Sequence, residues 1–155
     1  MPHYQIHKTQ KLAGSTDEIW EFISNPNNLK RITPPEMGFD ITSGNGASMM
    51  YAGMIITYKV SPLFGIKMNW VTEISQVEEK KFFIDEQRIG PYKFWHHQHK
   101  ISEIENGVLM EDMITYQPPF GILGGILNAV VIKKSLNKIF DFRGQVLREI
   151  YGEIS

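Results

Sequence analysis

Two histidines and one aspartate carry the clearest chemical signal in the sequence. His97 and His99 stand two positions apart in an alternating run, so a β-strand would direct both imidazoles, with Trp95, to one face. We expect this face to point inward. Asp112 belongs to the next alternating run, in a set that ends at Tyr116. Pairing of the two runs would place the Asp112 carboxylate beside both imidazoles.

This group of side chains is compatible with three kinds of chemistry. The first, which we favour, is a hydrogen-bonded polar layer in the core or a cavity wall, where the carboxylate fixes the imidazole tautomers. The second is recognition of a carbonyl or hydroxyl on an otherwise apolar ligand. The third is a metal site, because two histidines and a carboxylate can form a facial ligand set. We expect neither a resident metal nor a cofactor.

An enzymatic alternative uses the same side chains. His97, His99, Asp112 and Tyr116 could act as acid and base, since histidine titrates near neutrality and a nearby carboxylate raises its pKa. The sequence contains neither a nucleophile signature nor a phosphate-binding loop. A binding protein is therefore expected before an enzyme.

The first third of the chain predicts one strand and two short helices. Residues Tyr4–Leu12 alternate in polarity, which is typical of a strand with one wet face or near an edge. Ser15 and Glu18 form a capping box at the start of a helix. Asn25, followed by proline, predicts a second cap and a short helix over Asn27–Ile32.

From Phe39 onward the pattern has period two and predicts five or six antiparallel strands. The clearest hairpin is at Asn106-Gly107, between runs Lys93–Ile104 and Val108–Gln117, because both turn residues tolerate positive φ. The other predicted turns are Ser43-Gly44-Asn45-Gly46, Ser61-Pro62, Glu78-Glu79-Lys80 and Gly90-Pro91.

After Pro118-Pro119 the period changes to three and four, which predicts a long amphipathic helix from about Leu123 to about Tyr151. We interpret its basic residues, Arg143 included, as a solvated face. The apolar stretch Pro119–Ile132 is too short to cross a bilayer, which needs about 20 apolar residues. Lysines follow it, so transient contact with a membrane surface is the alternative.

Composition narrows the class of protein. A chain of 155 residues is expected to form one domain, residues 1–155. The net charge of -1 provides no broad basic field, so we expect no nucleic-acid partner. The lack of cysteine fits a reducing compartment, and residues Met1–Ala13 lack the apolar core of a signal peptide, so we expect a cytoplasmic protein. The sequence does not indicate an oligomeric state.

The expected fold is α+β: a twisted antiparallel sheet of six to seven strands around a long C-terminal helix, with two short helices after the first strand. Three segments resemble the START-like helix-grip superfamily (SRPBCC), in its small bacterial ligand-binding, polyketide cyclase/dehydrase-like branch. They are Gly90–His99, Leu109–Asp112 and Tyr116–Gly121, and the similarity extends over nearly the whole chain. The resemblance implies the helix-grip fold and brings no universal catalytic residue.

We therefore expect a binding or carrier protein for a lipid, isoprenoid, quinone or aromatic polyketide, held between sheet and helix. Trp70 either fills the core or offers a platform for a flat ligand. Asp85 or Gln87 either adds polarity to the wall or lies at a solvated edge. The alternatives are a polyketide cyclase/dehydratase and an interaction module whose core is filled by its own side chains. The predicted ligand-binding residues are Trp70, Gln87, Trp95, His97, His99, Asp112, Tyr116, Phe120 and Phe140.

Overall fold

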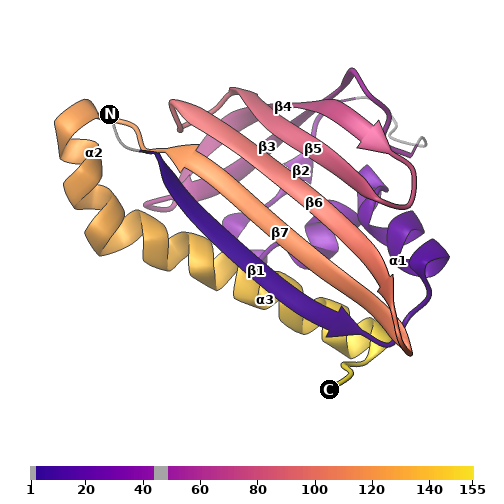
Figure 1. Cartoon of the computed structure of the whole chain (residues 1–155). Helices are drawn as coiled ribbons and strands as arrows, with labels where there is room; N and C mark the ends of the chain where they lie inside the picture. Colours follow the sequence, from indigo (N-terminus) through magenta and orange to yellow (C-terminus); the bar gives the residue numbers. More distant parts are fainter. Residues whose placement is uncertain (1–2, 44–48) are drawn as a thin grey trace.

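The computed structural model describes residues 3–43 and 49–155. The described strands form one antiparallel sheet with the order β1-β7-β6-β5-β4-β3-β2 (Figure 1). They are β1 (Tyr4–Leu12), β2 (Asp40–Ile41), β3 (Met54–Leu63), β4 (Ile66–Glu78), β5 (Phe82–Ile89), β6 (Phe94–Ile104) and β7 (Gly107–Gln117). The helical segments are α1 (Thr16–Ile23), η1 (Pro26–Ile32), η2 (Pro35–Met37), α2 (Gly121–Leu127), η3 (Asn128–Ile132) and α3 (Lys133–Tyr151).

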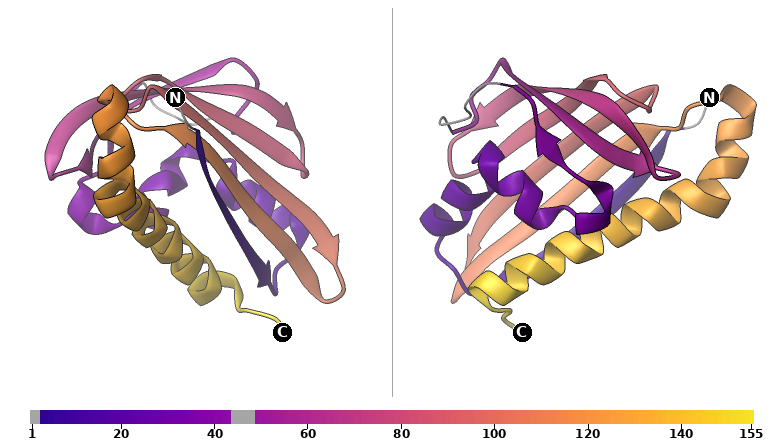
Figure 2. Two further views of the ribbon diagram at one scale, coloured as in Figure 1. Left: turned by 60° about the vertical axis from the view of Figure 1, so that its left-hand side comes forward. Right: turned by 180° about the vertical axis from the view of Figure 1, so that it is seen from behind.

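The sheet curves around α3, which runs along its concave side, while α1, η1 and η2 lie beside α3 on that same side (Figure 2). Helix α3 contacts both β1 and η1. This is the predicted helix-grip arrangement, and it leaves the space between the sheet and α3 to be filled by side chains.

Both predicted short helices are confirmed, and local capping explains where they begin. The Ser15 hydroxyl accepts a hydrogen bond from the Glu18 amide at 3.2 Å, and the Glu18 carboxylate accepts one from the Ser15 amide at 3.0 Å. The Asn25 side chain accepts a hydrogen bond from the Asn27 amide at 3.0 Å. The second helix, η1, is a 3-10 helix rather than an α-helix.

The turn predicted at Ser61-Pro62 is wrong, because β3 continues to Leu63 and the turn lies at Phe64-Gly65, with φ of 55° and 67°. The pairing of β3 with β4 shifts its register between Val60 and Leu63. At such an irregularity a proline, which cannot donate to the ladder, is tolerated. Most of the turn predicted at 43–46 lies outside the described residues.

The predicted hairpin between β6 and β7 forms, one residue earlier than expected. Ile104 pairs with Gly107, so Glu105 and Asn106 are the loop residues, and Asn106 has φ of 65°. Gly107 serves a different purpose from the one predicted: a Cβ there would lie 2.1 Å from the Leu12 carbonyl oxygen. Its lack of a side chain allows β7 to approach the end of β1.

The residues after α3 cover the end of β1, which is the outermost strand on its side of the sheet. The Ala13 amide donates to the Gly152 carbonyl at 2.9 Å, and the Ile154 amide donates to the Lys11 carbonyl at 3.2 Å. Part of this strand's free edge is therefore already hydrogen-bonded.

The predicted long helix is confirmed, beginning at Gly121 and ending at Tyr151. It contains a π-helical segment, η3, where the Tyr116 hydroxyl donates to the Asn128 side-chain oxygen at 2.6 Å. The predicted solvated face is wrong at Arg143, which is buried. Arg143 shares the apolar stripe of α3 with Leu136, Phe140 and Leu147, which turns it toward the sheet.

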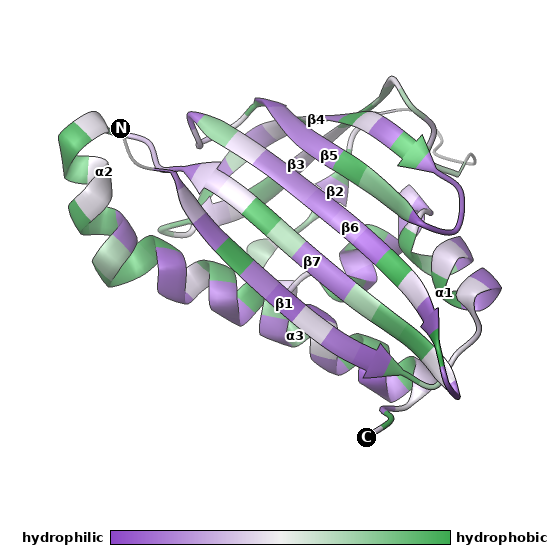
Figure 3. Ribbon diagram, in the orientation of Figure 1, coloured by the Kyte–Doolittle hydropathy of each residue, from purple (hydrophilic) through white to green (hydrophobic). Residues whose placement is uncertain are grey.

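Helix α2 projects beyond the sheet and carries an apolar surface (Figures 1 and 3). Its exposed apolar side chains, and those flanking it, are Phe120, Ile122, Leu123, Ile126 and Val130, which we call the α2 patch. Across the two described ranges, none of the helices combines the length and apolar composition required to cross a membrane.

Candidate functional site

A cavity of about 140 Å³ lies between the sheet and α3. Its walls come from β3, β4, β5 and β6, from the η1–η2 segment and from α3. A cavity of roughly 150 Å³ in a protein core accommodates one benzene molecule, so this space is the size of a single ring.

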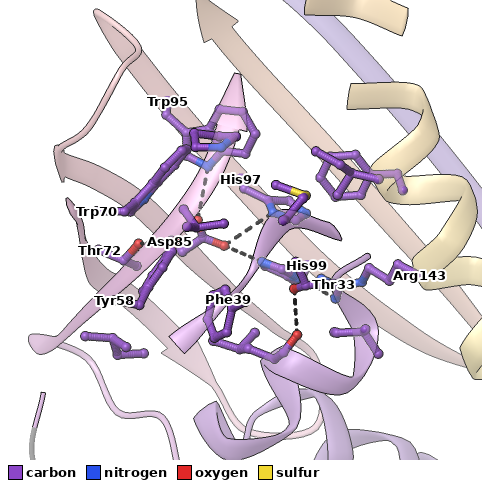
Figure 4. A pocket seen from close by; sticks show the side chains of 18 of the residues that line it. Thr33, Phe39, Tyr58, Trp70, Thr72, Asp85, Trp95, His97, His99 and Arg143 are labelled. Atoms are coloured by element: carbon purple, nitrogen blue, oxygen red, sulfur yellow. Dashed lines mark hydrogen bonds and ion pairs between the residues drawn. The ribbon is translucent and has the colours of Figure 1, made fainter. Parts of the chain in front are cut away.

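Aromatic side chains form a large part of the cavity wall, together with aliphatic ones (Figure 4). The rings of Tyr58 and Trp70 are nearly parallel, with centroids 6.0 Å apart. Trp95 meets Trp70 edge to face at 5.4 Å, and Phe39 lies 4.6 Å from Tyr58. These side chains form a rigid apolar surface suited to a flat ring.

The polar part of the wall is a stacked pair of imidazoles between two carboxylates. The rings of His97 and His99 lie 3.5 Å apart. On the cavity side, His97 Nδ1 lies 3.3 Å from Asp85 Oδ2, and His99 Nε2 contacts the same oxygen. On the far side, Asp112 Oδ1 lies 2.8 Å from His97 Nε2 and 3.3 Å from His99 Nδ1.

Two further donors complete this cluster. Trp95 Nε1 donates a hydrogen bond to Asp85 Oδ1 at 3.2 Å. Arg143 Nη2 donates to His99 Nδ1 at 3.0 Å and lies 3.6 Å from Asp112 Oδ1. The helix therefore contributes a cation to a polar group that is otherwise built from β5, β6 and β7.

Burial and neighbouring charges set the ionisation of the cluster. Burial opposes ionisation of Asp112, but Arg143 and the two histidines outweigh it and hold the pKa of that carboxyl well below its usual range. For Asp85, burial again acts against the charged form, and His97 and His99 outweigh it and lower the pKa.

The pKa values of the two imidazoles shift in opposite directions. Burial disfavours the charged form of His97, but Asp85 and Asp112 outweigh it and raise the pKa. The pKa of His99 is lowered by burial and then by the charge of His97. Two carboxylates lie beside one guanidinium, so a proton on His97 would bring the cluster to neutrality and a bound cation could replace that proton.

The structure brings five of the nine predicted ligand-binding residues to the cavity: Trp70, Trp95, His97, His99 and Phe140. The other four, Gln87, Asp112, Tyr116 and Phe120, lie outside its lining. Asp112 stands behind the histidines, and the Tyr116 hydroxyl is bonded to Asn128. Gln87 Nε2 donates a hydrogen bond to the Tyr92 carbonyl at 2.6 Å, and Gln87 Oε1 accepts one from the Tyr92 amide at 3.1 Å. The Phe120 side chain is exposed.

Asp85 and Arg143 are the important site residues absent from the predicted set. For Asp85 the signal was present, because it alternates with buried Phe83 on the inward face of β5. For Arg143 the signal was its place in the apolar stripe of the helix, and its charge led to the opposite interpretation.

Three buried donors around the cavity lack a hydrogen-bond partner among the described residues: Trp70 Nε1, the Tyr92 hydroxyl and Arg143 Nε. All three residues line the cavity. Buried polar groups in native proteins are almost always paired, so these three donors call for acceptors from water or from a bound molecule.

Comparison with solved structures identifies the class of fold. A START superfamily protein from Mycobacterium smegmatis superposes with a TM-score of 0.72 over 97% of each chain, at 13% identity. Major latex-like protein 151 from Panax ginseng gives 0.68 over 96% of this chain and 97% of its own, at 15% identity. A Chromobacterium violaceum protein gives 0.70 over 97% and 99%, at 11% identity.

At these identities the likeness defines the fold. The chain has the helix-grip fold of START-like proteins, as the sequence resemblance implied. No protein-family model matches the sequence. No curated protein matches it either.

Proposed function

We propose that this chain binds and carries a small hydrophobic or amphipathic molecule in the cavity between the sheet and α3. The proposal rests on the set of three unpaired donors around a cavity that is lined mainly by apolar side chains. Apolar burial would supply affinity, and Trp70, Tyr92 and Arg143 would orient an acceptor oxygen.

The size of the cavity narrows the ligand class within this proposal. About 140 Å³ accepts one ring and not a long chain. Of the expected ligands, a quinone or an aromatic polyketide fits best, with a ring inside and its oxygens at the unpaired donors. A lipid or isoprenoid would place only its head in the cavity and leave its tail at the opening.

The opening lies between the η1–η2 segment and α3, where the partly exposed lining residues Leu29, Thr33, Met37 and Ile139 meet. Glu36 and Lys138 form an ion pair of 3.0 Å between the same two elements. A guest is expected to pass here, because the rest of the wall belongs to the sheet and to buried helix faces.

A polyketide cyclase or dehydratase is the alternative within the same cavity. Two of its four expected acid–base residues, Asp112 and Tyr116, lie outside the lining, which leaves His97 and His99 to act on a guest. Replacing His97 with alanine separates the two functions. A carrier would change its selectivity and still bind, whereas an enzyme would lose turnover with binding retained.

Ile139→Trp is expected to weaken guest binding at least tenfold, because the indole would fill the opening of a ring-sized cavity. The measurement is native mass spectrometry of freshly purified protein with extraction of what co-purifies, followed by titration with the extracted compound or, in its place, a naphthoquinone. Ile150→Trp is the matched control, since Ile150 is exposed on the same helix and is absent from the cavity lining. Equal affinities for the two variants, or a wild-type chain that takes no guest, would favour the self-filled interaction module.

We further propose that the α2 patch touches a membrane surface during exchange of the guest. Ile122 is 92% exposed, and the other four side chains of the patch are more than 60% exposed. Lys133 and Lys134 follow the patch and are exposed, which suits the anionic headgroups around an inserted apolar face.

The double substitution Ile122→Ser with Leu123→Ser is expected to reduce vesicle binding several-fold, because it removes two of the five apolar side chains. Co-sedimentation with phosphatidylcholine vesicles, with and without phosphatidylserine, measures this, and the wild type should prefer the anionic vesicles. A wild type that ignores both vesicles but forms dimers abolished by the double substitution would show that the patch binds a second copy. A cytoplasmic location and one domain over residues 1–155 stay predictions from the sequence.

A further inference from the structure

We propose that Asp85, His97 and His99 form a binding site for a divalent first-row transition metal at the wall of the cavity. This goes beyond guest binding and departs from the sequence expectation that no metal is held. The ligand set also differs from the facial set considered in the sequence, because its carboxylate is Asp85 and not Asp112.

The donor atoms of these three residues are close enough together to bind one metal ion. One carboxylate oxygen of Asp85 and one ring nitrogen from each histidine lie within 4.8 Å of one another. Metal–ligand bonds of about 2.1 Å place neighbouring donors roughly 3 to 3.5 Å apart at tetrahedral or octahedral angles. The separation of 3.3 Å between His97 Nδ1 and Asp85 Oδ2 falls in this range.

The hydrogen-bond partners of the three ligands also favour metal binding. Metal-binding histidines usually donate their other ring nitrogen to a carboxylate, which fixes the ring and raises its basicity. Here Asp112 Oδ1 lies 2.8 Å from the outer nitrogen of His97, whereas the outer nitrogen of His99 accepts a hydrogen bond from Arg143 Nη2 at 3.0 Å. The second oxygen of Asp85 accepts from Trp95, so each of the three ligands already has an outer partner.

Packing holds the ligands in place before any ion arrives. Phe83 stacks on the His99 ring with centroids 4.0 Å apart, and Phe140 meets the His97 ring edge-on at 5.2 Å. The histidine side chains are 3% and 5% exposed and that of Asp85 is 17% exposed. A preorganised set of this kind loses little freedom when a metal binds.

The ligand types and their position define the chemical class of the site. Two imidazoles and one carboxylate suit zinc, and with open positions they also suit ferrous iron. All three residues line the cavity, so an ion there would keep open positions on the side where a guest binds. The site belongs with metal centres that accept a further ligand and not with closed structural ones.

Competition titration of the metal-depleted full chain with Zn²⁺ and with Co²⁺, against a chromophoric chelator, tests the proposal. We expect one ion per chain and visible Co²⁺ bands typical of four or five ligands. Asp85→Asn should weaken binding at least 100-fold, because it removes a charged ligand and keeps its shape. Asp112→Asn should weaken it about 10- to 100-fold through the outer nitrogen of His97.

His96→Gln is the matched control, since His96 directly precedes His97 and points to the opposite face of β6. It should leave affinity and the Co²⁺ spectrum unchanged. Circular dichroism and urea unfolding establish that each variant is folded. Wild-type affinity no higher than that of Asp85→Asn, or loss of the bound ion in His96→Gln, would overturn the proposal and leave a hydrogen-bonded polar layer. Guest titrations run with a chelator keep this outcome separate from that of the carrier proposal.

Discussion

Replacing Arg143 with methionine is expected to lower the free energy of unfolding by about 3 to 5 kcal/mol. The guanidinium is the permanent cation of the buried cluster, 3.6 Å from Asp112 and 3.0 Å from His99. Methionine preserves much of the side-chain volume but leaves two buried carboxylates with less compensating charge. Urea unfolding followed by circular dichroism measures the loss.

Arg148→Met is the control for this prediction. Arg148 is on the same helix, its side chain is 41% exposed, and its ion pair with Glu153 spans 4.0 Å, so the change should stay within about 0.5 kcal/mol. Combining Arg143→Met with Asp112→Asn should cost less than the two single changes added together, because the neutral amide no longer needs the cation. If Arg143→Met lowers the free energy of unfolding no more than Arg148→Met does, the role of Arg143 in the buried cluster is contradicted.

Replacing Phe83 with alanine is expected to cost about 3 to 5 kcal/mol of unfolding free energy. The ring is 1% exposed and joins two parts of the core, since it stacks on His99 and meets Trp20 edge to face at 6.0 Å. Its removal would leave a void beside the histidine pair. Equilibrium unfolding gives the energy, and Trp20 should report the loss in the near-ultraviolet circular dichroism.

Phe82→Ala provides the comparison, because Phe82 is the neighbouring residue on the opposite, partly exposed face of β5. It should cost only about 1 kcal/mol. Similar losses for both variants would mean that Phe83 does not connect α1 to the histidine pair.

The sequence predicts the fold well where the signal is periodic and local. Alternation places His97, His99 and Asp112 on buried faces, whereas the register that pairs His99 with Asp112 depends on a loop one residue earlier than the predicted one. The capping box at Ser15 is equally local, since donor and acceptor are three residues apart. Such signals need no knowledge of the rest of the chain.

The errors arise where tertiary contacts override local preference. Pro62 reads as a turn residue, but a register shift accommodates it within a strand. The charge of Arg143 predicts a solvated side chain, but His99 and the Asp112 carboxylate, both on distant strands, contact it in the interior. Phe120 reads as a ligand contact, but it begins a helix that projects away from the cavity.

The volume of the cavity also could not be predicted from the sequence. It depends on how closely α3 approaches the sheet, and therefore on the packing of large rings such as Trp70 and Phe140. A pattern of apolar residues predicts that these rings face inward. It does not predict the volume that remains between them.

The hydrogen bonds between residues 152–154 and the end of β1 bear on self-association. An exposed outer strand is a template onto which another molecule can add its own strand, and long chains of such additions produce fibrils. Here an incoming strand would first have to displace the contacts of Ala13 with Gly152 and of Lys11 with Ile154. Loss of these contacts would expose the template and favour polymerisation, so the short segment after the long helix protects the protein from aggregation.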